Sequence, residues 1–423
     1  MTAAAELLVD LHVHSRYSRA CARGITPGAI ALWARLKGLD IVGTGDFTHP
    51  EWLAELEAQL TEDGHGLLSP SSAACPEAAA APPSCRGNPR FMLTTEVCAV
   101  YAAAGRPRRI HHLIAVPGFA SARRCNAALA RFGDLGADGR PTLKADSRRI
   151  LDIVLGCGPG AFLVPAHIWT PWCSLLGARS GFNSLAECFG DLAPEVFAAE
   201  TGLSSDPPMN RRVSSLDRVT LVSGSDAHSP ARLGREGTVL RCKPEFAAIR
   251  RALARGKGGV GTIEFFPEEG KYYFDGHRRC GVGMHPGQAR RARGLCPVCG
   301  KAMTQGVLHR VDDLADRPAT VPPPGAQTHE HLVPLEEIIA EALEAGVRTR
   351  AVRRAYMGFI ERLGPELELL RRAPIEAIED AGPAAVGEAV RRMRRGETAI
   401  TPGYDGAYGT IRLLPAPPRS GRS

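Results

Sequence analysis

Seven short apolar segments in the first 230 residues each carry, or lead into, a histidine or an acidic residue. These segments are residues 7–11, 39–44, 91–96, 110–116, 162–166, 196–200 and 220–225. Apolar runs of this length, separated by helix-sized stretches, are typical of buried parallel strands in βα units. In barrels built from such units, the carboxyl ends of the strands line the active site. The sequence therefore predicts an α/β barrel with ligand-type side chains gathered at its functional end.

The polar residues of these segments are of the kinds that bind divalent metal ions. Imidazole and carboxylate groups suit Zn²⁺, Mn²⁺ or Mg²⁺, and paired ions can activate a water molecule for hydrolysis. On a straight strand only one of the neighbours His111 and His112 can face inward, so we assign His112 and keep His111 as the alternative. We predict two to three ions, held by His12, His14, Asp46, His49, Glu96, His112, His167, Glu200, Asp226 and His228.

Three of these residues are expected to serve catalysis directly: Asp226, Glu96 and His228. Side chains two apart on a strand point to the same side, so His12 with His14, and Asp226 with His228, can each face one site. Glu96 has two oxygens and can bridge two ions. The competing interpretation is that these are ordinary polar residues of a barrel. Recurrence of ligand types at all seven segments favours the metal site.

A second set of ligand types lies further along the chain. His277, Cys280, Cys296 and Cys299 have the paired spacing of a zinc ribbon or finger. Four such ligands with no open position indicate one structural Zn²⁺ ion. His309 is the alternative if His277 is not a ligand.

Composition bears on the location of the protein and on the class of partner that it binds. The chain has 423 residues and a formal net charge of +7, which weakly favours a polyanionic partner. No apolar run is long enough to span a membrane, and the N-terminus has no signal-like region, so we expect no membrane partner. The expected location is the cytoplasm, in association with the nucleoid.

Changes in composition divide the chain into five parts. We predict a catalytic barrel over residues 1–262, with a mobile insertion at 64–88 that contains neither strand nor helix. A zinc-binding module follows at 263–316, and a Pro-rich linker at 317–334. A helical domain is expected over 335–412, with helices at 335–345, 347–363 and 383–395. The last part, residues 413–423, reads as a disordered tail.

The segments around the predicted ligands resemble the motifs of the polymerase and histidinol phosphatase (PHP) family. The similar stretches are DLHVHSRYS, GTGDFTH, TTEV, PAHIW and SGSDAH. This resemblance implies a distorted seven-stranded βα barrel with a trinuclear metal site for phosphoester hydrolysis. Phe47 stands where the family's motif often has a histidine, and His49 is the candidate to replace it.

The whole order of parts resembles the endonuclease Q family of DNA repair nucleases, from about residue 7 to residue 412. Residues 165–189, 200–210, 261–282, 296–318 and 402–409 carry this similarity. The resemblance implies cleavage on the 5′ side of uracil, hypoxanthine, xanthine or an abasic site, which leaves a 3′-hydroxyl and a 5′-phosphate. The implied partner is double-stranded DNA containing a damaged base, with a sliding clamp as a further candidate.

An enzyme that inspects a base should extrude it and stack it on apolar or aromatic surfaces. The segment after His167 offers such residues, and we assign DNA and base binding to Trp169, Trp172, Arg179, Ser180, Phe182 and Asn210. The alternative is that the aromatic side chains only pack their own loop. Arginines of the last helix, with Arg310, could hold phosphates or simply be solvated. Two rival functions remain: a phosphoesterase acting on a small phosphorylated molecule, and a non-catalytic DNA-binding protein.

Overall fold

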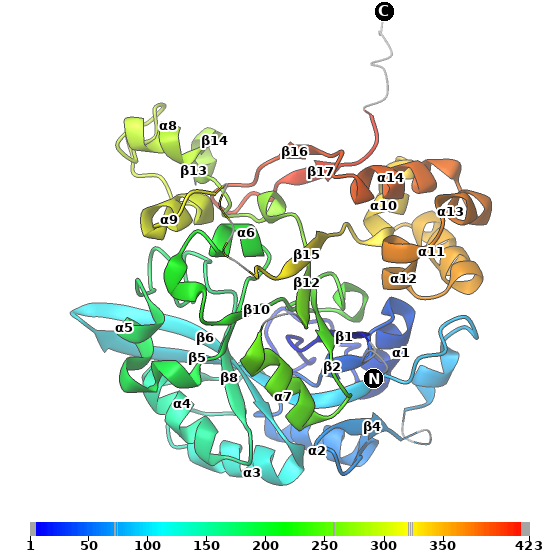
Figure 1. Ribbon diagram of the computed structural model, residues 1–423, viewed down its shortest axis with the longest axis horizontal. Coiled ribbons are helices and arrows are strands. Elements are labelled where there is room, and N and C mark those ends of the chain that lie inside the picture. The colour runs from blue at the N-terminus through cyan, green and yellow to red at the C-terminus, as the bar shows by residue number, and fades with distance from the viewer. Residues whose placement is uncertain are drawn as a thin grey trace, which may run out of the picture.

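All seven apolar segments form strands, but these strands run in both directions (Figure 1). The computed structural model describes residues 6–71, 73, 75–256, 259–319, 321, 323 and 325–415. The main sheet consists of β1 (Glu6–Asp10), β2 (Ile41–Gly43), β3 (Leu60–Glu62), β4 (Leu68–Pro70), β5 (Arg90–Ala103), β6 (Arg106–Val116), β7 (Thr142–Leu143), β8 (Phe162–Pro165), β11 (Gly237–Arg241), β12 (Val260–Glu264) and β15 (Thr328–His331). Three two-stranded sheets add β9 (Ala198–Glu200) with β10 (Thr220–Val222), β13 (Asp275–His277) with β14 (Val282–Met284), and β16 (Ala399–Thr401) with β17 (Thr410–Arg412).

The helices fall into three groups along the chain. Those of the N-terminal α/β region are α1 (Pro27–Lys37), α2 (Pro50–Gln59), α3 (Gly118–Leu129), α4 (Ser147–Gly156), α5 (Leu185–Phe189), α6 (Pro207–Asn210) and α7 (Phe246–Arg255). Two lie in the segment 263–316, which we call the Cys-rich segment: α8 (Pro286–Arg291) and α9 (Val307–Leu314). The C-terminal group is α10 (Leu335–Ala342), α11 (Arg350–Leu363), α12 (Glu366–Arg372), α13 (Ile375–Ala381) and α14 (Ala384–Arg394). Short 3₁₀ turns are Pro76–Ala80, Gly190–Glu195, Ser214–Leu216, Pro230–Arg232, Pro267–Glu269 and Arg278–Cys280.

The expectation of parallel strands holds only for part of the main sheet. Strands β1, β2 and β5 are parallel, whereas β6 pairs antiparallel with both β5 and β8. The reason is a tight turn between β5 and β6, where Ala104 and Gly105 both have positive φ angles (50° and 70°). Two such residues are typical of the turn of a β-hairpin. The sequence analysis missed this turn and therefore predicted the wrong direction for β6.

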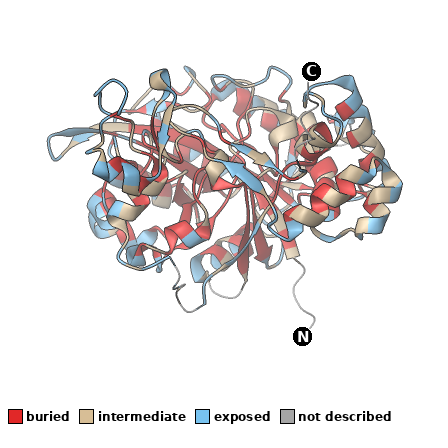
Figure 2. Ribbon diagram, turned by 90° about the horizontal axis from the view of Figure 1, so that it is seen from above, coloured by how far each residue is buried: buried red, intermediate tan, exposed pale blue. Residues whose placement is uncertain are grey.

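The resulting architecture is a mixed α/β fold, and its core lies between the sheet and the surrounding helices (Figure 2). Sheet order runs β15-β12-β11-β1-β2-β5-β4-β3, with β6 and β8 extending it from β5. Strands β9 and β10 pair only with each other among the described residues. Closure into a seven-stranded barrel therefore stays a prediction.

Helix α1 illustrates how local sequence sets an element. The Thr26 side chain accepts a hydrogen bond from the Ala29 backbone N–H (3.0 Å), and Pro27 occupies the first turn. Gly38 ends the helix with a φ angle of 83°, a conformation that glycine adopts without strain. These residues set the start and the end of the helix.

The C-terminal helices pack on α1 through a buried ion pair. The Lys37 Nζ atom lies 2.5 Å from Glu366 Oε2, and both side chains are nearly fully buried. Glu366 also accepts hydrogen bonds from the Tyr356 hydroxyl (2.9 Å) and the Leu335 backbone N–H (3.1 Å). A buried charge needs such partners, because an unpaired one is strongly destabilising. This network fixes the C-terminal helices against the α/β region.

Two segments that were expected to be irregular contain regular structure. The 64–88 segment holds β4 and the 3₁₀ turn Pro76–Ala80, and Arg35 donates hydrogen bonds to the Ala78 and Cys85 carbonyls. The 317–334 segment holds β15, which pairs with β12. Of the predicted tail, Leu413 is buried, while residues 416–423 lie outside the described residues.

The C-terminal helices include those predicted, as α10, α11 and α14, and two short ones between them, α12 and α13. Beyond α14 the chain returns across the molecule as the β16–β17 hairpin, which reaches the Cys-rich segment (Figure 1). No helix in the described part of the chain has the length and apolar character needed to cross a membrane.

Candidate active site

Five of the predicted metal-binding residues meet in one place, together with His111, the alternative to His112. His12, His14, Glu96 and Asp226 form one group whose ligand atoms lie within 4.8 Å of each other, and Glu96, His111 and His167 form a second. We call these six residues the cup. They come from the segments that follow β1, β8 and β10 and from the paired strands β5 and β6.

Glu96 belongs to both groups because its two oxygens face different histidines. Oε1 lies 2.7 Å from His111 Nδ1 and 3.1 Å from His167 Nε2. Oε2 lies 3.2 Å from His14 Nε2 and 3.6 Å from His12 Nε2. This is the arrangement expected of a carboxylate that bridges two metal ions.

Asp226 completes the first group. Its Oδ1 atom lies 3.0 Å from His14 Nε2 and 3.6 Å from His12 Nε2. All three atoms are buried without a hydrogen-bond partner. Buried polar atoms are normally satisfied, so a convergence of unsatisfied donors and acceptors marks a place for an ion. The residues therefore fit a divalent metal.

Two carboxylates hold the histidines of the cup from behind. Glu200 contacts His12 Nδ1 at 2.9 Å, and Asp46 contacts His14 Nδ1 at 3.0 Å. A carboxylate on the far ring nitrogen fixes the orientation of a metal-binding histidine and leaves its Nε2 free. Asp46 and Glu200 were predicted as ligands, and the structure places them one layer behind the ligand positions instead.

The electrostatics of the cup follow from opposite charges buried together. Burial lowers the pKa of His12 and His14, but the neighbouring carboxylates outweigh this effect and raise both pKa values well above the usual range. Burial likewise raises the pKa of Glu96, yet His111, His12 and Arg140 hold it well below the usual value. The acidic residues of the cup are therefore ionised and ready to bind cations.

His111, not His112, faces the cup, so the assignment of His112 is corrected. Neighbouring residues of a strand point to opposite faces. His112 lies on the other face, where its Nε2 atom contacts the Ser147 hydroxyl at 2.8 Å and its ring packs on Phe189. Burial lowers the pKa of His112 to about 3, which keeps it neutral.

His49 and Phe47 do not contribute to either group of ligands. His49 begins α2 and stacks on Tyr17, with ring centroids 4.3 Å apart. Phe47 is fully buried in the core. Among the described residues, two overlapping ligand groups meet at the cup.

His228 lies at the rim of the cup. Its Nδ1 atom donates a hydrogen bond to the Asp226 carbonyl (2.8 Å), so Nδ1 carries the proton and Nε2 does not. Burial lowers the pKa of His228, which favours the same neutral form. This side chain can accept a proton or contact a metal through Nε2.

Three residues of the site have positive φ angles without being glycine: Asp46 (47°), His167 (29°) and Asp226 (46°). Such conformations are uncommon for residues with a side chain and tend to occur at functional sites. All three lie a few residues beyond the ends of β2, β8 and β10, where the backbone turns at the edge of the cup.

A cavity of about 620 Å³ opens above the cup. His111, His167, Asp226 and His228 reach it from the cup and its rim. Four cationic side chains line its walls: Arg140, Arg232, Arg235 and Lys271. Arg140 also pairs with Glu96 Oε2 at 3.0 Å. Sequence reasoning did not identify these cations, because an arginine in a loop carries no sign of where the loop will fold.

Of the six residues assigned to DNA and base binding, only Trp172 lines this cavity, and it is 44% exposed. Trp169 is buried and donates a hydrogen bond to Asn210 (2.7 Å), which is itself buried. Ser180 and Phe182 are buried, and Ser180 donates to the Arg109 carbonyl (3.1 Å). Arg179 is exposed outside the cavity lining. For the buried four, loop packing explains their positions.

Arginines assigned to phosphate binding also have structural partners. Arg310 donates hydrogen bonds to the Leu176 and Phe182 carbonyls. On α14, Arg394 donates to the Leu369, Leu370 and Ala373 carbonyls at the end of α12. Arg391 pairs with Glu379 and Glu388. These three side chains therefore have structural roles within the fold.

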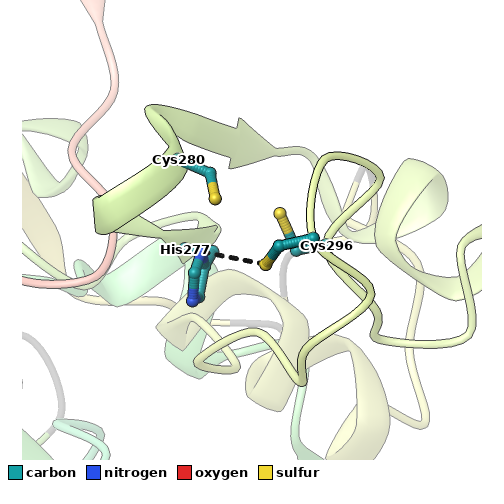
Figure 3. Close-up of side chains that lie close together, drawn as sticks. His277, Cys280 and Cys296 are labelled. Carbon is teal, nitrogen blue, oxygen red and sulfur yellow. Dashed lines mark hydrogen bonds between the residues drawn. The ribbon is translucent and has the colours of Figure 1, made fainter.

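The second ligand set converges as predicted. The ligand atoms of His277, Cys280, Cys296 and Cys299 lie within 4.8 Å of one another, and Figure 3 shows three of these side chains facing a common point. His277 Nδ1 is 3.7 Å from Cys299 Sγ. His309 is not part of this group, because its Nδ1 atom lies 2.5 Å from Asp275. One imidazole and three thiol groups at these distances fit a structural Zn²⁺ ion.

Comparison with known proteins places these features in a family. Residues 334–397 match the model of the MJ0043 C-terminal domain. The protein MJ0043 of Methanocaldococcus jannaschii is 32% identical over 261 residues, which are 59% of this chain and 32% of that protein. This chain thus spans about a third of that relative's length.

Two solved structures match almost the whole chain. One is the lesion-specific endonuclease PfuEndoQ from Pyrococcus furiosus, with a TM-score of 0.83, 30% identity, and coverage of 96% of this chain and 95% of that chain. The other is endonuclease Q in complex with a 27-mer duplex carrying an abasic lesion at its active site, with a TM-score of 0.83, 30% identity, and coverage of 99% and 100%. The protein therefore belongs to the endonuclease Q family of endodeoxyribonucleases.

Proposed function

We propose that this protein is a metal-dependent DNA repair endonuclease that hydrolyses the phosphodiester on the 5′ side of a deaminated base or an abasic site. The deaminated bases are uracil, hypoxanthine and xanthine, and the products carry a 3′-hydroxyl and a 5′-phosphate. The observation that carries the proposal is the pair of ligand groups sharing Glu96, at the floor of a cavity with cationic walls, in a member of the endonuclease Q family.

Two divalent ions in the cup would supply a hydroxide nucleophile and would balance the negative charge that develops on the phosphate. The protein's own residues position this chemistry. Glu200 and Asp46 hold the imidazoles of His12 and His14, so that each Nε2 points into the cup. Asp226 and Glu96 provide the anionic oxygens, and neutral His228 at the rim can take up a proton at Nε2.

The cavity walls suit a phosphate backbone. Arg140, Arg232, Arg235 and Lys271 surround the cup from three different segments. Phosphate contacts from arginine and lysine position a protein on DNA without reading its sequence. Arg140 is placed to contact the phosphate nearest the cup, because its guanidinium group already lies against Glu96.

We further propose that His277, Cys280, Cys296 and Cys299 bind one structural Zn²⁺ ion. All four positions of a tetrahedral site would be filled by protein ligands, which leaves none open for catalysis. A role on duplex DNA in the nucleoid belongs to the same proposal, as do the domain limits expected from the sequence, apart from the corrected segments 64–88, 317–334 and 413–423. A sliding clamp has no support among the described surfaces.

The experiment that tests the function compares two classes of substrate. The protein is incubated with Mg²⁺ or Mn²⁺ and either a duplex containing one uracil or a small phosphomonoester such as para-nitrophenyl phosphate. The proposal expects cleavage of the duplex and no comparable release from the monoester. Efficient hydrolysis of the monoester alone would instead support a small-molecule phosphoesterase. Metal-independent binding of DNA without cleavage would support a binding protein.

A further inference from the structure

The segment that carries Asp226, residues 223–228, crosses from β10 towards the main sheet without forming a strand of its own. A strand ladder therefore does not fix its conformation. Ala227 forms an isolated bridge with Val13, and its carbonyl accepts a hydrogen bond from the His14 backbone N–H at 3.0 Å. This bridge fixes the chain directly after Asp226. A separate set of contacts fixes the chain directly before it.

Ser225, the residue before Asp226, has both of its backbone polar groups held by side chains. Its N–H donates a hydrogen bond to Oδ1 of the fully buried Asp10 (3.0 Å). Its carbonyl accepts a hydrogen bond from Arg235 Nε (2.8 Å). The other oxygen of Asp10, Oδ2, accepts a hydrogen bond from the Gly234 backbone N–H (2.9 Å). Asp10 thus ties Ser225 to the turn that carries Arg235.

Asp226 needs such support because its backbone has a conformation that residues with a side chain rarely adopt. Its φ angle is 46°. A non-glycine residue keeps a positive φ angle only where the surrounding structure holds it there. The Ser225 carbonyl belongs to the peptide plane that precedes Asp226, so the bond from Arg235 opposes a rotation of this plane. Relaxation of the φ angle would move the Asp226 carboxylate relative to His12 and His14.

We propose that Asp10 and Arg235 are positioning residues for the cup, which hold Ser225 so that the Asp226 carboxylate faces the metal site. The inference rests on the metal-binding role in the proposed function, and it deepens that role by naming residues that set the affinity of the cup for metal. Arg235 also lines the cavity above the cup. Its charge can therefore face a phosphate, while its Nε atom holds the backbone next to Asp226.

Arg232 provides a contrast within the same turn. It lines the same cavity, yet its guanidinium group pairs with Glu337 of α10. In the described part of the chain, the Arg232 side chain makes no hydrogen bond to residues 223–228. If Arg235 served only to attract phosphate, the two arginines would have equivalent roles. The bond to Ser225 makes them different.

The two roles of Arg235 predict opposite effects on metal binding. A positive charge in the cavity repels a divalent cation at the cup, so its removal should by itself strengthen metal binding. Loss of the bond to Ser225 should weaken metal binding, because the Asp226 carboxylate is no longer held in place. Loss of a supporting residue around a metal lowers the affinity about 10–100-fold. The sign of the change therefore separates positioning from a purely electrostatic role.

The test measures the affinity for Mn²⁺ without DNA, by electron paramagnetic resonance of the free ion, in full-length protein dialysed against EDTA. Arg235→Met removes the charge and places a methyl group at the same number of bonds from the α-carbon as Nε. Arg235→Gln also removes the charge, but it places an amide N–H at that position, where it can still donate to Ser225. Arg232→Met is the matched control, since it removes a charge from the same turn. Thermal unfolding shows that each variant is folded at the temperature of the titration.

We expect Arg235→Met to bind Mn²⁺ about tenfold or more weakly than the parent does. Arg235→Gln and Arg232→Met should bind Mn²⁺ at least as tightly as the parent, because both lose a repelling charge and both leave Ser225 held. Rescue by glutamine, which restores the donor but not the charge, would be the signature of a positioning residue.

Asp10→Asn tests the other side of the contact. Asparagine has one acceptor oxygen in place of two, and its amide group meets the N–H of Ser225 or Gly234. We expect weaker Mn²⁺ binding here too. Asp40→Asn is the control, because Asp40 accepts a hydrogen bond from the Leu8 N–H on the same strand (2.8 Å), and it should bind Mn²⁺ as the parent does. If Asp10→Asn does not fold, the Arg235 variants decide the question.

Two results would overturn the proposal. Unchanged or tighter Mn²⁺ binding by Arg235→Met would leave Arg235 only its charge, and equal weakening by Arg235→Met and Arg235→Gln would exclude the bond to Ser225 as the cause. If the parent protein bound no Mn²⁺, the metal-dependent function would fail, and the positioning role with it. A parent that binds Mn²⁺ but does not cleave damaged DNA would refute the proposed function and leave the positioning role to be decided by the variants.

Discussion

His12 and His14 each present one ring nitrogen to the cup and the other to a carboxylate, Glu200 or Asp46. This pairing explains why two ligand-type residues from separate strands do not themselves reach the site. A histidine held in this way has a fixed tautomer and needs no rearrangement to bind an ion. At the scale of residues, Glu200 and Asp46 thus fix the orientation of the two histidines before any ion binds.

Asp226 is the residue on which the cup depends most directly. Asp226→Asn keeps the shape of the side chain but removes the charge that faces His12 and His14. Cleavage should fall at least about a hundredfold, because loss of even a supporting residue around a metal costs about 10–100-fold. Metal content by elemental analysis should fall as well, while thermal unfolding stays near that of the parent.

The matched control is Asp152→Asn, which alters an exposed aspartate that pairs only with Arg149. It should cut DNA as the parent does. Near-normal cleavage by Asp226→Asn in metal-buffered solution would place the metal site elsewhere.

A buried acid outside the cup should make stability depend on pH. Burial raises the pKa of Glu236 from 4.5 to about 8, and its Oε2 atom has no hydrogen-bond partner. An acid whose pKa is higher in the folded protein than in the unfolded chain binds its proton more tightly in the folded state. Its protonation at low pH therefore stabilises the fold. That stability is lost as the pH rises from about 4.5 to about 8.

Glu236→Gln removes this ionisation. The variant should therefore unfold at a higher temperature than the parent at pH 8, and the difference should shrink towards pH 5. Differential scanning calorimetry across this range measures both. Glu361→Gln, an exposed position, serves as the control and should follow the parent at every pH. A difference between parent and Glu236→Gln that does not change with pH would contradict the assigned cause.

At the scale of elements, the sequence was informative where one residue pattern has one structural meaning. Thr26 followed by Pro27 is a favoured start of a helix, and α1 begins there. The spacing of Cys296 and Cys299, with His277 and Cys280, predicts that these four residues form one ligand group, and their ligand atoms do converge. Both patterns need only local information.

The sequence was less informative where partners decide the outcome. An apolar run does not show whether its strand is parallel or antiparallel, so the direction of β6 was wrong and the choice of His112 with it. Ligand type at a strand end did not separate Glu96, which faces the cup, from Glu200, which lies behind His12. These differences depend on distances between segments far apart in the chain.

The Cys-rich segment provides the prediction at this scale. Cys296→Ser removes one of four ligand groups, so the segment should lose its Zn²⁺ ion and its order around residues 275–305, since binding energy at such sites is folding energy. Elemental analysis should show one fewer zinc per molecule, and limited proteolysis should cut within this segment. The control Cys242→Ser lies outside the cluster and should keep its zinc. Unchanged zinc in Cys296→Ser would contradict the assignment.

At the scale of the whole molecule, three parts of the chain meet above the cup. Trp172 comes from the α/β region, Tyr272 from the segment leading into the Cys-rich part, and Tyr408 from the loop between β16 and β17. The buried pair of Lys37 and Glu366 holds the C-terminal helices in place, and the hairpin spans from them to the Cys-rich segment (Figure 1). No local sequence pattern predicts that these three parts of the chain lie together.

Under the proposed function, the cup would hydrolyse the phosphodiester and the cationic cavity walls would hold the DNA backbone. An enzyme that inspects a base has to extrude it from the duplex, and extrusion is easiest where pairing is already weak. The central claim is therefore that the protein cuts beside a damaged base and spares intact duplex.

The most direct test maps the cut itself. A duplex with a single uracil and a 5′ label on the damaged strand is incubated with the protein and Mn²⁺, and the product is sized against a ladder on a sequencing gel. An identical duplex without the lesion runs in parallel, and EDTA serves as the metal-free control. The account predicts one product that ends in a 3′-hydroxyl immediately 5′ of the uracil, none from the intact duplex and none with EDTA. Equal cutting of the intact duplex, or cutting that persists in EDTA, would contradict it.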